Sequence, residues 1–170
     1  MQFPDSDFWD FSIGFYNNAD VEKSCLSLQD NHSLNVNLIL FCFWLGLKHK
    51  EKLEHKQLQK LINISLPWEE ITVSLRKSRL MLKHSPIAMP ADFKQETNEG
   101  VCKLELNTEH MQQLALEQEW KKIKSTPSDE KSEDIIRHNI KTYLRATQHN
   151  IAAEAVENEI RVLIENTVKV

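Results

Sequence analysis

The most distinctive pattern in the chain is an unbroken run of ten apolar positions, residues 38–47. Polar Asn35 and Asn37 precede this run, and the lysine-rich segment 48–52 follows it directly. A helix that is apolar on every side is buried either in a membrane or at the centre of a bundle. Because a helix needs about 20 apolar residues to cross a bilayer, we predict a central core helix over about residues 35–48. Residues 38–45 are expected to be among the most buried.

Apolar residues at helical spacing predict further helices on both sides of the central one. Before it, Ser6 and Asp20 stand where they would cap the first turns of two helices. After it, we expect helices over about residues 51–64, 65–84, 92–124, 136–144 and 153–163. Ser65 would cap the second of these, with Pro67 tolerated in its first turn. The chain is therefore predicted to be an all-α, single-domain helical bundle of about seven or eight helices around the central apolar helix.

Two prolines in residues 85–91 mark the best candidate for a linker within this domain, which covers residues 1–170. We expect an N-terminal helical core over residues 1–84 and C-terminal helices over residues 92–170 that pack on it. The long helix of about residues 92–124 is mostly polar. Its helical spacing predicts one buried seam, made of Val101, Leu104, Thr108, Met111 and Ala115.

Composition limits the classes of protein that the chain can belong to. With 170 residues, 41% of them apolar, the chain can bury a core without disulfides or metals. Cys25, Cys42 and Cys102 show no paired spacing, so we interpret them as reduced thiols in the core and predict no metal or cofactor. The first residues lack a basic segment followed by an apolar one, which favours a cytoplasmic protein.

A group of polar residues next to the central helix is the first candidate site. Gln29, Asp30, Asn35 and Asn37 surround the predicted junction before this helix, and Trp44 lies about two turns into it. Ligand sites combine apolar walls with a few polar groups, so a small pocket is one interpretation. The favoured interpretation is structural, because buried helix ends need capping partners and Asn35 is placed to supply one.

Basic residues near the end of the predicted helix 65–84 are the second candidate site: Arg76, Lys77, Arg79 and Lys83. A nucleic-acid patch is possible in principle, but the net charge of −4 and the lack of interleaved aromatic residues disfavour it. Cations near a helix C-terminus also complement the helix dipole, so a solvated face is favoured. Glu105 and Glu109 are one turn apart but do not have the Glu-x-x-His spacing of di-metal bundles.

Several segments together resemble a known family. They are residues 8–12 (FWDFS), 25–30 (CLSLQD) and the VN…LFC.WLG pattern of residues 36–46. The pattern resembles a family of small, predicted helical bacterial proteins, mostly proteobacterial, whose function is unknown. The resemblance spans roughly residues 8–120 and implies a cytoplasmic helical domain without implying an activity. The chain departs from the pattern at Ser33, where a glycine is expected, and at Asn35, where an aspartate is expected; this favours a capping role for Asn35.

These observations favour a non-enzymatic protein-interaction module whose partner is another protein, with no membrane association. The chain contains no catalytic motif and no glycine-rich phosphate-binding loop. An enzyme or small-molecule sensor with a pocket near Asp30, Asn35, Asn37 and Trp44 is the alternative. Nucleic-acid association through the basic residues of the predicted helix 65–84 is the second alternative. The sequence does not define the oligomeric state.

Overall fold

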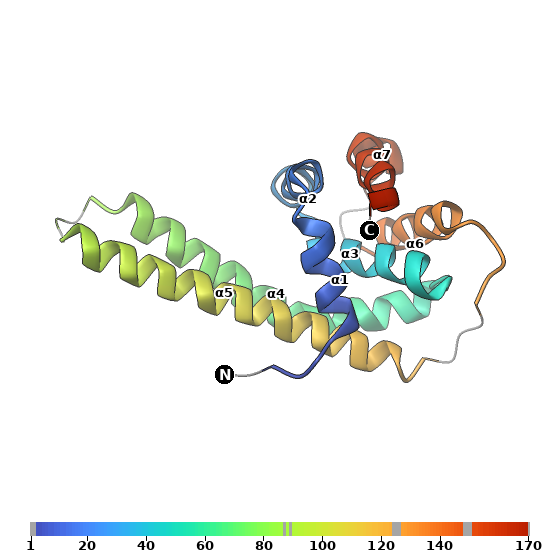
Figure 1. Ribbon diagram of the computed structural model, residues 1–170, viewed down its shortest axis with the longest axis horizontal. Coiled ribbons are helices and arrows are strands. Elements are labelled where there is room, and N and C mark those ends of the chain that lie inside the picture. The colour runs from blue at the N-terminus through green and yellow to red at the C-terminus, as the bar shows by residue number, and fades with distance from the viewer. Residues whose placement is uncertain (1–2, 87, 89, 124–126, 148–150, 170) are drawn as a thin grey trace.

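A hairpin of two long antiparallel helices, α4 (His55–His84) and α5 (Ala91–Trp120), dominates the structure. The computed structural model describes residues 3–86, 88, 90–123, 127–147 and 151–169. Figure 1 shows one end of the hairpin projecting well beyond the other helices, which gather around its opposite half. No helix of the described part of the chain is long and apolar enough to cross a membrane.

The described residues form seven α-helices and no strand, which confirms the predicted all-α single-domain fold. Beside the hairpin these are α1 (Asp7–Tyr16), α2 (Ala19–His32), α3 (Val36–Trp44), α6 (Ser132–Ala146) and α7 (Glu157–Glu165). A π-helical turn, Leu45–His49, extends α3. Two short 3₁₀ segments, Ala153–Val156 and Asn166–Lys169, flank α7.

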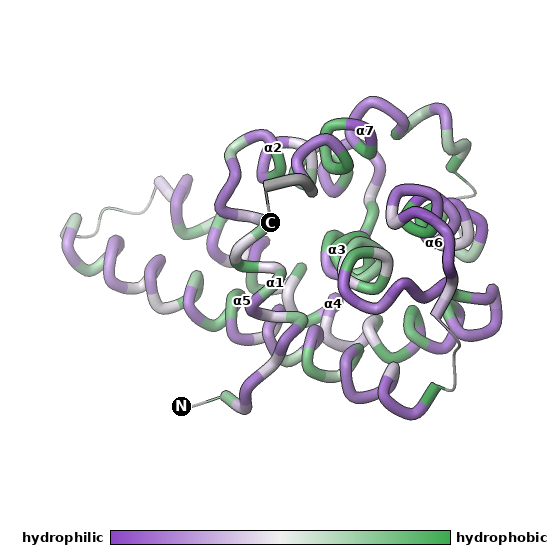
Figure 2. Tube along the Cα trace, turned by 45° about the vertical axis from the view of Figure 1, so that its right-hand side comes forward, coloured by the Kyte–Doolittle hydropathy of each residue, from purple (hydrophilic) through white to green (hydrophobic). Residues whose placement is uncertain are grey.

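The apolar helix α3 lies at the centre of the fold, as its sequence predicts. Every residue from 38 to 45 is at most 3% exposed. Helices α1, α2, α5 and α6 pack directly against α3, and Figure 2 shows it nearly end-on inside a ring of other helices. Asn35 caps it, because its side chain accepts a hydrogen bond from the Leu38 amide at 3.1 Å. The central helix and its cap are thus confirmed.

The π-helical turn at the end of α3 depends on the small size of Gly46. A Cβ atom at this position would lie 2.5 Å from Cγ1 of Ile136, so α6 approaches the backbone here more closely than a side chain would allow. The turn ends at Lys50, whose φ of 58° is in the left-handed region. It places the His49 ring against the rings of Trp44 and Trp120, with centroid distances of 4.5 and 4.2 Å.

Two predicted helix starts are wrong. The helices expected over residues 51–64 and 65–84 form the single helix α4, in which Ser65 is fully buried and Pro67 is internal. An internal proline costs about 3 kcal/mol, but α4 packs along α5 on both sides of it, and Gln112 of α5 donates a hydrogen bond to the Ser65 carbonyl at 3.2 Å. At α2, Asn18 is the N-cap in place of Asp20 and accepts a hydrogen bond from the Asp20 amide.

The predicted seam of α5 is wrong in part. Thr108 contacts Thr72 of α4, but Leu104 is 53% exposed and Met111 is 37% exposed, whereas Glu105, Gln112 and Gln113, further around α5, are buried. Polar residues of α5 thus face its neighbours, because they find hydrogen-bond partners there. Cys25 and Cys42 are buried as predicted, but Cys102 on α5 is exposed.

The proline-containing segment 85–91 lies at the tip of the hairpin. Helix α4 ends at His84 and α5 begins at Ala91, and the described residues between them are not helical. Residues 87 and 89 of this predicted linker lie outside the described residues. The segment joins two helices that pack along each other, so α4 and α5 belong to one packed unit.

One buried carboxylate fastens the start of α1 to the hairpin. Ser6, the N-cap of α1, accepts a hydrogen bond from the Trp9 amide and donates its hydroxyl to Glu117 of α5 at 2.6 Å. The same carboxylate accepts a hydrogen bond from the Phe8 amide, and anions are favoured at a helix N-terminus. This contact fixes how α1 crosses the hairpin, and the candidate site lies beside that crossing.

Candidate functional site

A cleft of about 600 Å³ separates the hairpin from α1, α2 and the start of α3. Its walls are formed by α1 and α2 on one side and by α4 and α5 on the other, and Asn35 and Asn37 contribute from α3. From Cys102 to Gln113, α5 borders the cleft over about 16 Å, given the usual rise per residue of an α-helix. The cleft is therefore elongated along the hairpin.

Exposed apolar side chains line the cleft on both sides. Ile13 of α1 and Leu26 of α2 are 43% and 41% exposed, and Val73 of α4 and Leu106 of α5 are 51% and 48% exposed. These four residues, which we call the apolar rim, come from four different helices. Burying apolar side chains of this size against a bound molecule is energetically favourable. The apolar rim therefore has the character of a contact surface.

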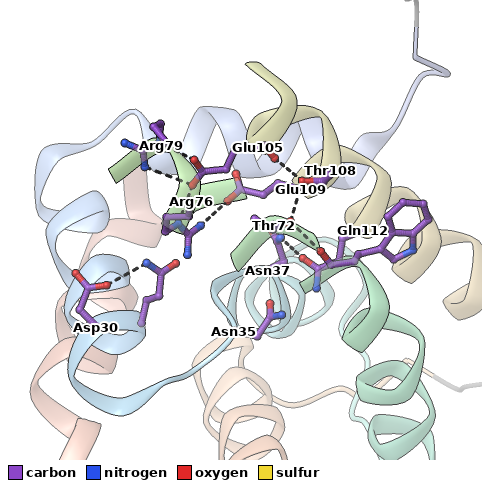
Figure 3. Close-up of polar contacts among 12 residues, drawn as sticks. Asp30, Asn35, Asn37, Thr72, Arg76, Arg79, Glu105, Thr108, Glu109 and Gln112 are labelled. Atoms are coloured by element: carbon purple, nitrogen blue, oxygen red, sulfur yellow. Dashed lines mark hydrogen bonds and ion pairs between the residues drawn. The ribbon is translucent and has the colours of Figure 1, made fainter. Parts of the chain in front are cut away.

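Two arginines and two glutamates form a charged cluster in the wall of the cleft (Figure 3). Arg76 of α4 donates its Nε to Glu105 Oε1 at 2.7 Å and its Nη2 to Glu109 Oε1 at 2.9 Å. Arg79 donates its Nε to the other Glu105 oxygen at 2.7 Å. These four residues, the Arg–Glu cluster, join α4 to α5.

The two carboxylates of the Arg–Glu cluster differ in their electrostatic environment. Burial acts to raise the pKa of Glu105, but the hydrogen bonds from Arg79 and Arg76 outweigh it and lower the pKa overall. At Glu109 burial prevails over the attraction of Arg76, and the nearby charge of Glu105 adds to it, so the pKa is raised. The arginines thus balance the negative charge of the Glu109 carboxylate less completely than that of the Glu105 carboxylate.

Amide side chains form the floor of the cleft. Asn37 of α3 donates a hydrogen bond to Gln112, and its carbonyl oxygen accepts one from Gln113 Nε2 at 2.7 Å. Above them, the hydroxyls of Thr72 and Thr108 form a hydrogen bond of 2.8 Å between α4 and α5. The floor therefore ties the central helix to the hairpin through polar contacts.

Two buried polar atoms in the cleft lack a hydrogen-bond partner in the described structure. They are the hydroxyl of Ser12, a residue that is 3% exposed, and the carbonyl oxygen Oε1 of Gln113, a residue that is 2% exposed. Both residues line the cleft. Buried polar groups are nearly always hydrogen-bonded, so an unpartnered pair in a cleft indicates a place where another molecule can supply the missing bonds.

The structure brings together part of the first predicted site. Gln29, Asn35 and Asn37 line the cleft, whereas Asp30 is exposed and accepts a hydrogen bond from Gln29 at 3.1 Å. Trp44 does not belong to this group. It is 1% exposed and packs against Phe8, Phe41, His49 and Trp120.

Trp44 is separated from the polar group because it lies at the opposite end of α3. Seven residues place Asn37 and Trp44 on nearly the same side of the helix but about 10 Å apart along its axis. The cleft lies at the N-terminal end of α3. Asn37 and Trp44 are therefore close in sequence but contact different neighbours.

The predicted basic patch is divided in the structure. Arg76 and Arg79 face the cleft and are paired with Glu105 and Glu109, whereas Lys77 and Lys83 are exposed. A cation that is bound to a carboxylate contributes little to a phosphate site. The four residues thus do not form one cationic surface.

Sequence reasoning missed the cleft residues Tyr16, Glu22 and Glu69 as a group. Burial is the main cause that raises the pKa of Tyr16, and the charges of Cys25, Glu22 and Glu109 add to it. Helical spacing gave one usable signal, since Arg76 and Arg79 share a side of α4.

Among the described residues no group of three or more His, Cys, Asp or Glu side chains could hold a metal ion.

The fold and the cleft define this chain as an all-α protein with a charged cleft between helices. Residues 7–116 match the family described as "Protein of unknown function (DUF2390)", and the chain belongs to this family. All residues that line the cleft, from Trp9 to Gln113, fall within the matched segment. No curated protein and no solved structure matches the chain.

Proposed function

We propose that this protein is a non-enzymatic interaction module, and that its cleft binds a segment of another protein. The observation that carries the proposal is the apolar rim, in which four helices leave Ile13, Leu26, Val73 and Leu106 exposed around one cleft. Amphipathic helices commonly bind by laying their apolar face into such a groove. Covering the apolar rim would supply the hydrophobic part of the binding free energy.

The length of the cleft supports a peptide segment over a small ligand. Helix α5 borders it over about 16 Å, which corresponds to about three turns of a bound helix. Along α4 the cleft extends from Glu69 to Arg79, a stretch of similar length. A helical segment of about 12 residues would contact both walls over this distance.

The resemblance to bacterial, mostly proteobacterial proteins supports a cytoplasmic setting in a bacterium for this module. The neutralised Arg76 and Arg79 favour a protein partner over a nucleic acid, because their hydrogen bonds already go to Glu105 and Glu109. A small-molecule sensor remains the competing function, and the experiment below distinguishes the two.

The proposal can be tested by selecting binders from a displayed library of random peptides of about 12 residues, long enough for three helical turns. The selected peptides are then measured against the native protein, Val73→Gln and Ile71→Gln. Val73 and Ile71 are similarly exposed, at 51% and 46%, but lie about 200° apart around α4, so only Val73 borders the cleft.

We expect selected peptides to lose about tenfold or more in affinity with Val73→Gln and to bind Ile71→Gln as they bind the native protein, because a polar amide covered by an apolar contact opposes binding. Peptides that respond equally to both variants would overturn the proposal. Failure to select any peptide that depends on Val73 would overturn it as well and would favour the small-molecule alternative.

A further inference from the structure

The cleft holds more negative than positive side chains. Its lining includes the carboxylates Glu22, Glu69, Glu105 and Glu109 and the two guanidinium groups of the Arg–Glu cluster. The ion pairs of the described residues engage both arginines with Glu105 and Glu109, and they do not include Glu22 or Glu69. With the cluster balanced internally, Glu22 of α2 and Glu69 of α4 give the cleft its negative charge.

The unused hydrogen-bonding capacity of the cleft is mostly that of acceptors. Within the described residues, the buried Gln113 Oε1 has no donor and the buried Ser12 hydroxyl has no partner. Glu109 lies one helical turn before Gln113 on α5 and receives its hydrogen bond from Arg76 on one oxygen. A ligand that complements this wall would therefore bring donors and positive charge, as ammonium and guanidinium groups do.

We propose that the segment bound in the cleft is a basic amphipathic helix of a partner protein. Its apolar residues contact the apolar rim, and a lysine or arginine side chain enters between Glu22 and Glu69 and donates to the unpartnered acceptors below. This inference rests on the proposed function and specifies the chemistry of the partner.

The alternatives match the cleft less well. An acidic segment or a nucleic acid would meet Glu22 and Glu69, whose charge repels it, while Arg76 and Arg79 are already bound to carboxylates. A neutral apolar helix would cover the apolar rim but would leave both carboxylates without a counter-charge and Gln113 Oε1 without a donor.

A charge-matched pair of double variants tests this inference. Glu22→Gln with Glu69→Gln removes the two unpaired carboxylates of the cleft. Glu70→Gln with Glu154→Gln removes two exposed carboxylates that do not line it, so the net charge changes equally. The probes are peptides selected on the native protein, each paired with a version in which its lysine or arginine residues are replaced by glutamine.

We expect the selected peptides to carry lysine or arginine between apolar residues. Their affinity should fall about tenfold with the cleft variant, as expected for two partly screened charge contacts, and should be unchanged with the control variant. The glutamine version of a peptide should bind the native protein and the cleft variant equally.

Two results would overturn the inference. One is a set of selected peptides that are neutral or acidic; the other is an equal loss of affinity with the cleft variant and its control. If such peptides still depend on Val73, the proposed function stands and the basic partner is wrong. If no peptide depends on Val73, the proposed function itself has failed.

Discussion

Arg76 of α4 and Glu105 of α5 form an ion pair with an Nε–Oε1 distance of 2.7 Å across the hairpin. Arg76 also donates to Glu109 at 2.9 Å, one turn further along α5. The side chains of Arg76 and Glu105 are 24% and 9% exposed, so water screens the pair less than it screens a surface pair. Arg76 thus holds two carboxylates of α5 against α4 and shapes one wall of the cleft.

Arg76→Gln should therefore destabilise the protein. It leaves Glu109 without its cation and Glu105 with Arg79 alone, and we expect the free energy of unfolding to fall by about 1–3 kcal/mol, as for other lost charge-assisted hydrogen bonds. Arg161→Gln is the control, because it breaks an exposed pair with Glu165 and should cost less than about 0.5 kcal/mol. Urea unfolding compares them, and equal effects would contradict the structural role of Arg76.

Two buried serines of the α1 region should respond in opposite ways to alanine. Ser6 caps α1 and bonds Glu117, so Ser6→Ala should cost about 1–2 kcal/mol. The Ser12 hydroxyl has no partner, so Ser12→Ala should leave stability unchanged or raise it by up to about 1 kcal/mol. Urea unfolding of both variants measures the difference, and a clear loss of stability in Ser12→Ala would show that its hydroxyl is bonded after all.

His110 should make stability depend on pH. Its ring is stacked between Phe3 and Trp9, with centroid distances of 4.3 and 4.0 Å, and its buried Nε2 has no hydrogen-bond partner among the described residues. Burial lowers the pKa of His110 below its usual 6.5, although the charge of Asp10 opposes this. The neutral ring is thus the form that the fold favours.

Because the unfolded chain then takes up its proton first, His110 contributes stability above pH 6.5 that is lost as the pH falls through the folded pKa. His110→Phe keeps the stacking but cannot titrate, so its unfolding free energy should fall less between about pH 7.5 and pH 5.5. The exposed His84→Gln is the control and should keep the native pH dependence. An unchanged slope in His110→Phe would contradict this prediction.

The cap of the central helix provides a further test. Asn35→Ala removes the bond to the Leu38 amide and should cost about 1 kcal/mol, whereas aspartate can accept the same bond and should be nearly neutral. Thermal or urea unfolding measures both variants. Similar and negligible effects would remove the argument that Asn35 is a cap.

The sequence predicted the parts of this fold that depend on local patterns. The apolar run of residues 38–47 revealed the central helix, and Asn35 and Ser6 revealed two of the caps, because capping depends on neighbouring residues. The break expected at Ser65 and Pro67 is absent, because packing on α5 prevails over the local cost of a proline.

The cleft was harder to predict because it depends on which helices pair. The spacing of Arg76 and Arg79, and that of Glu105 and Glu109, is visible in the sequence, but their pairing requires α4 and α5 to lie antiparallel. The buried polar side of α5 was missed for the same reason, since the partners of Gln113 and Glu105 lie on α3 and α4. From the sequence alone, polar residues that form hydrogen bonds between helices cannot be distinguished from polar residues that face solvent.

Photo-crosslinking in the native host cell tests most directly whether the cleft binds another protein. A photoreactive residue is placed at Val73 in the cleft and, in a second variant, at the similarly exposed Ile71 on the other side of α4. We predict that Val73 captures a partner protein through a basic segment and that Ile71 does not. Capture at Ile71 alone, equal capture at both positions, or no capture at Val73 would contradict the claim that this cleft is the interaction site.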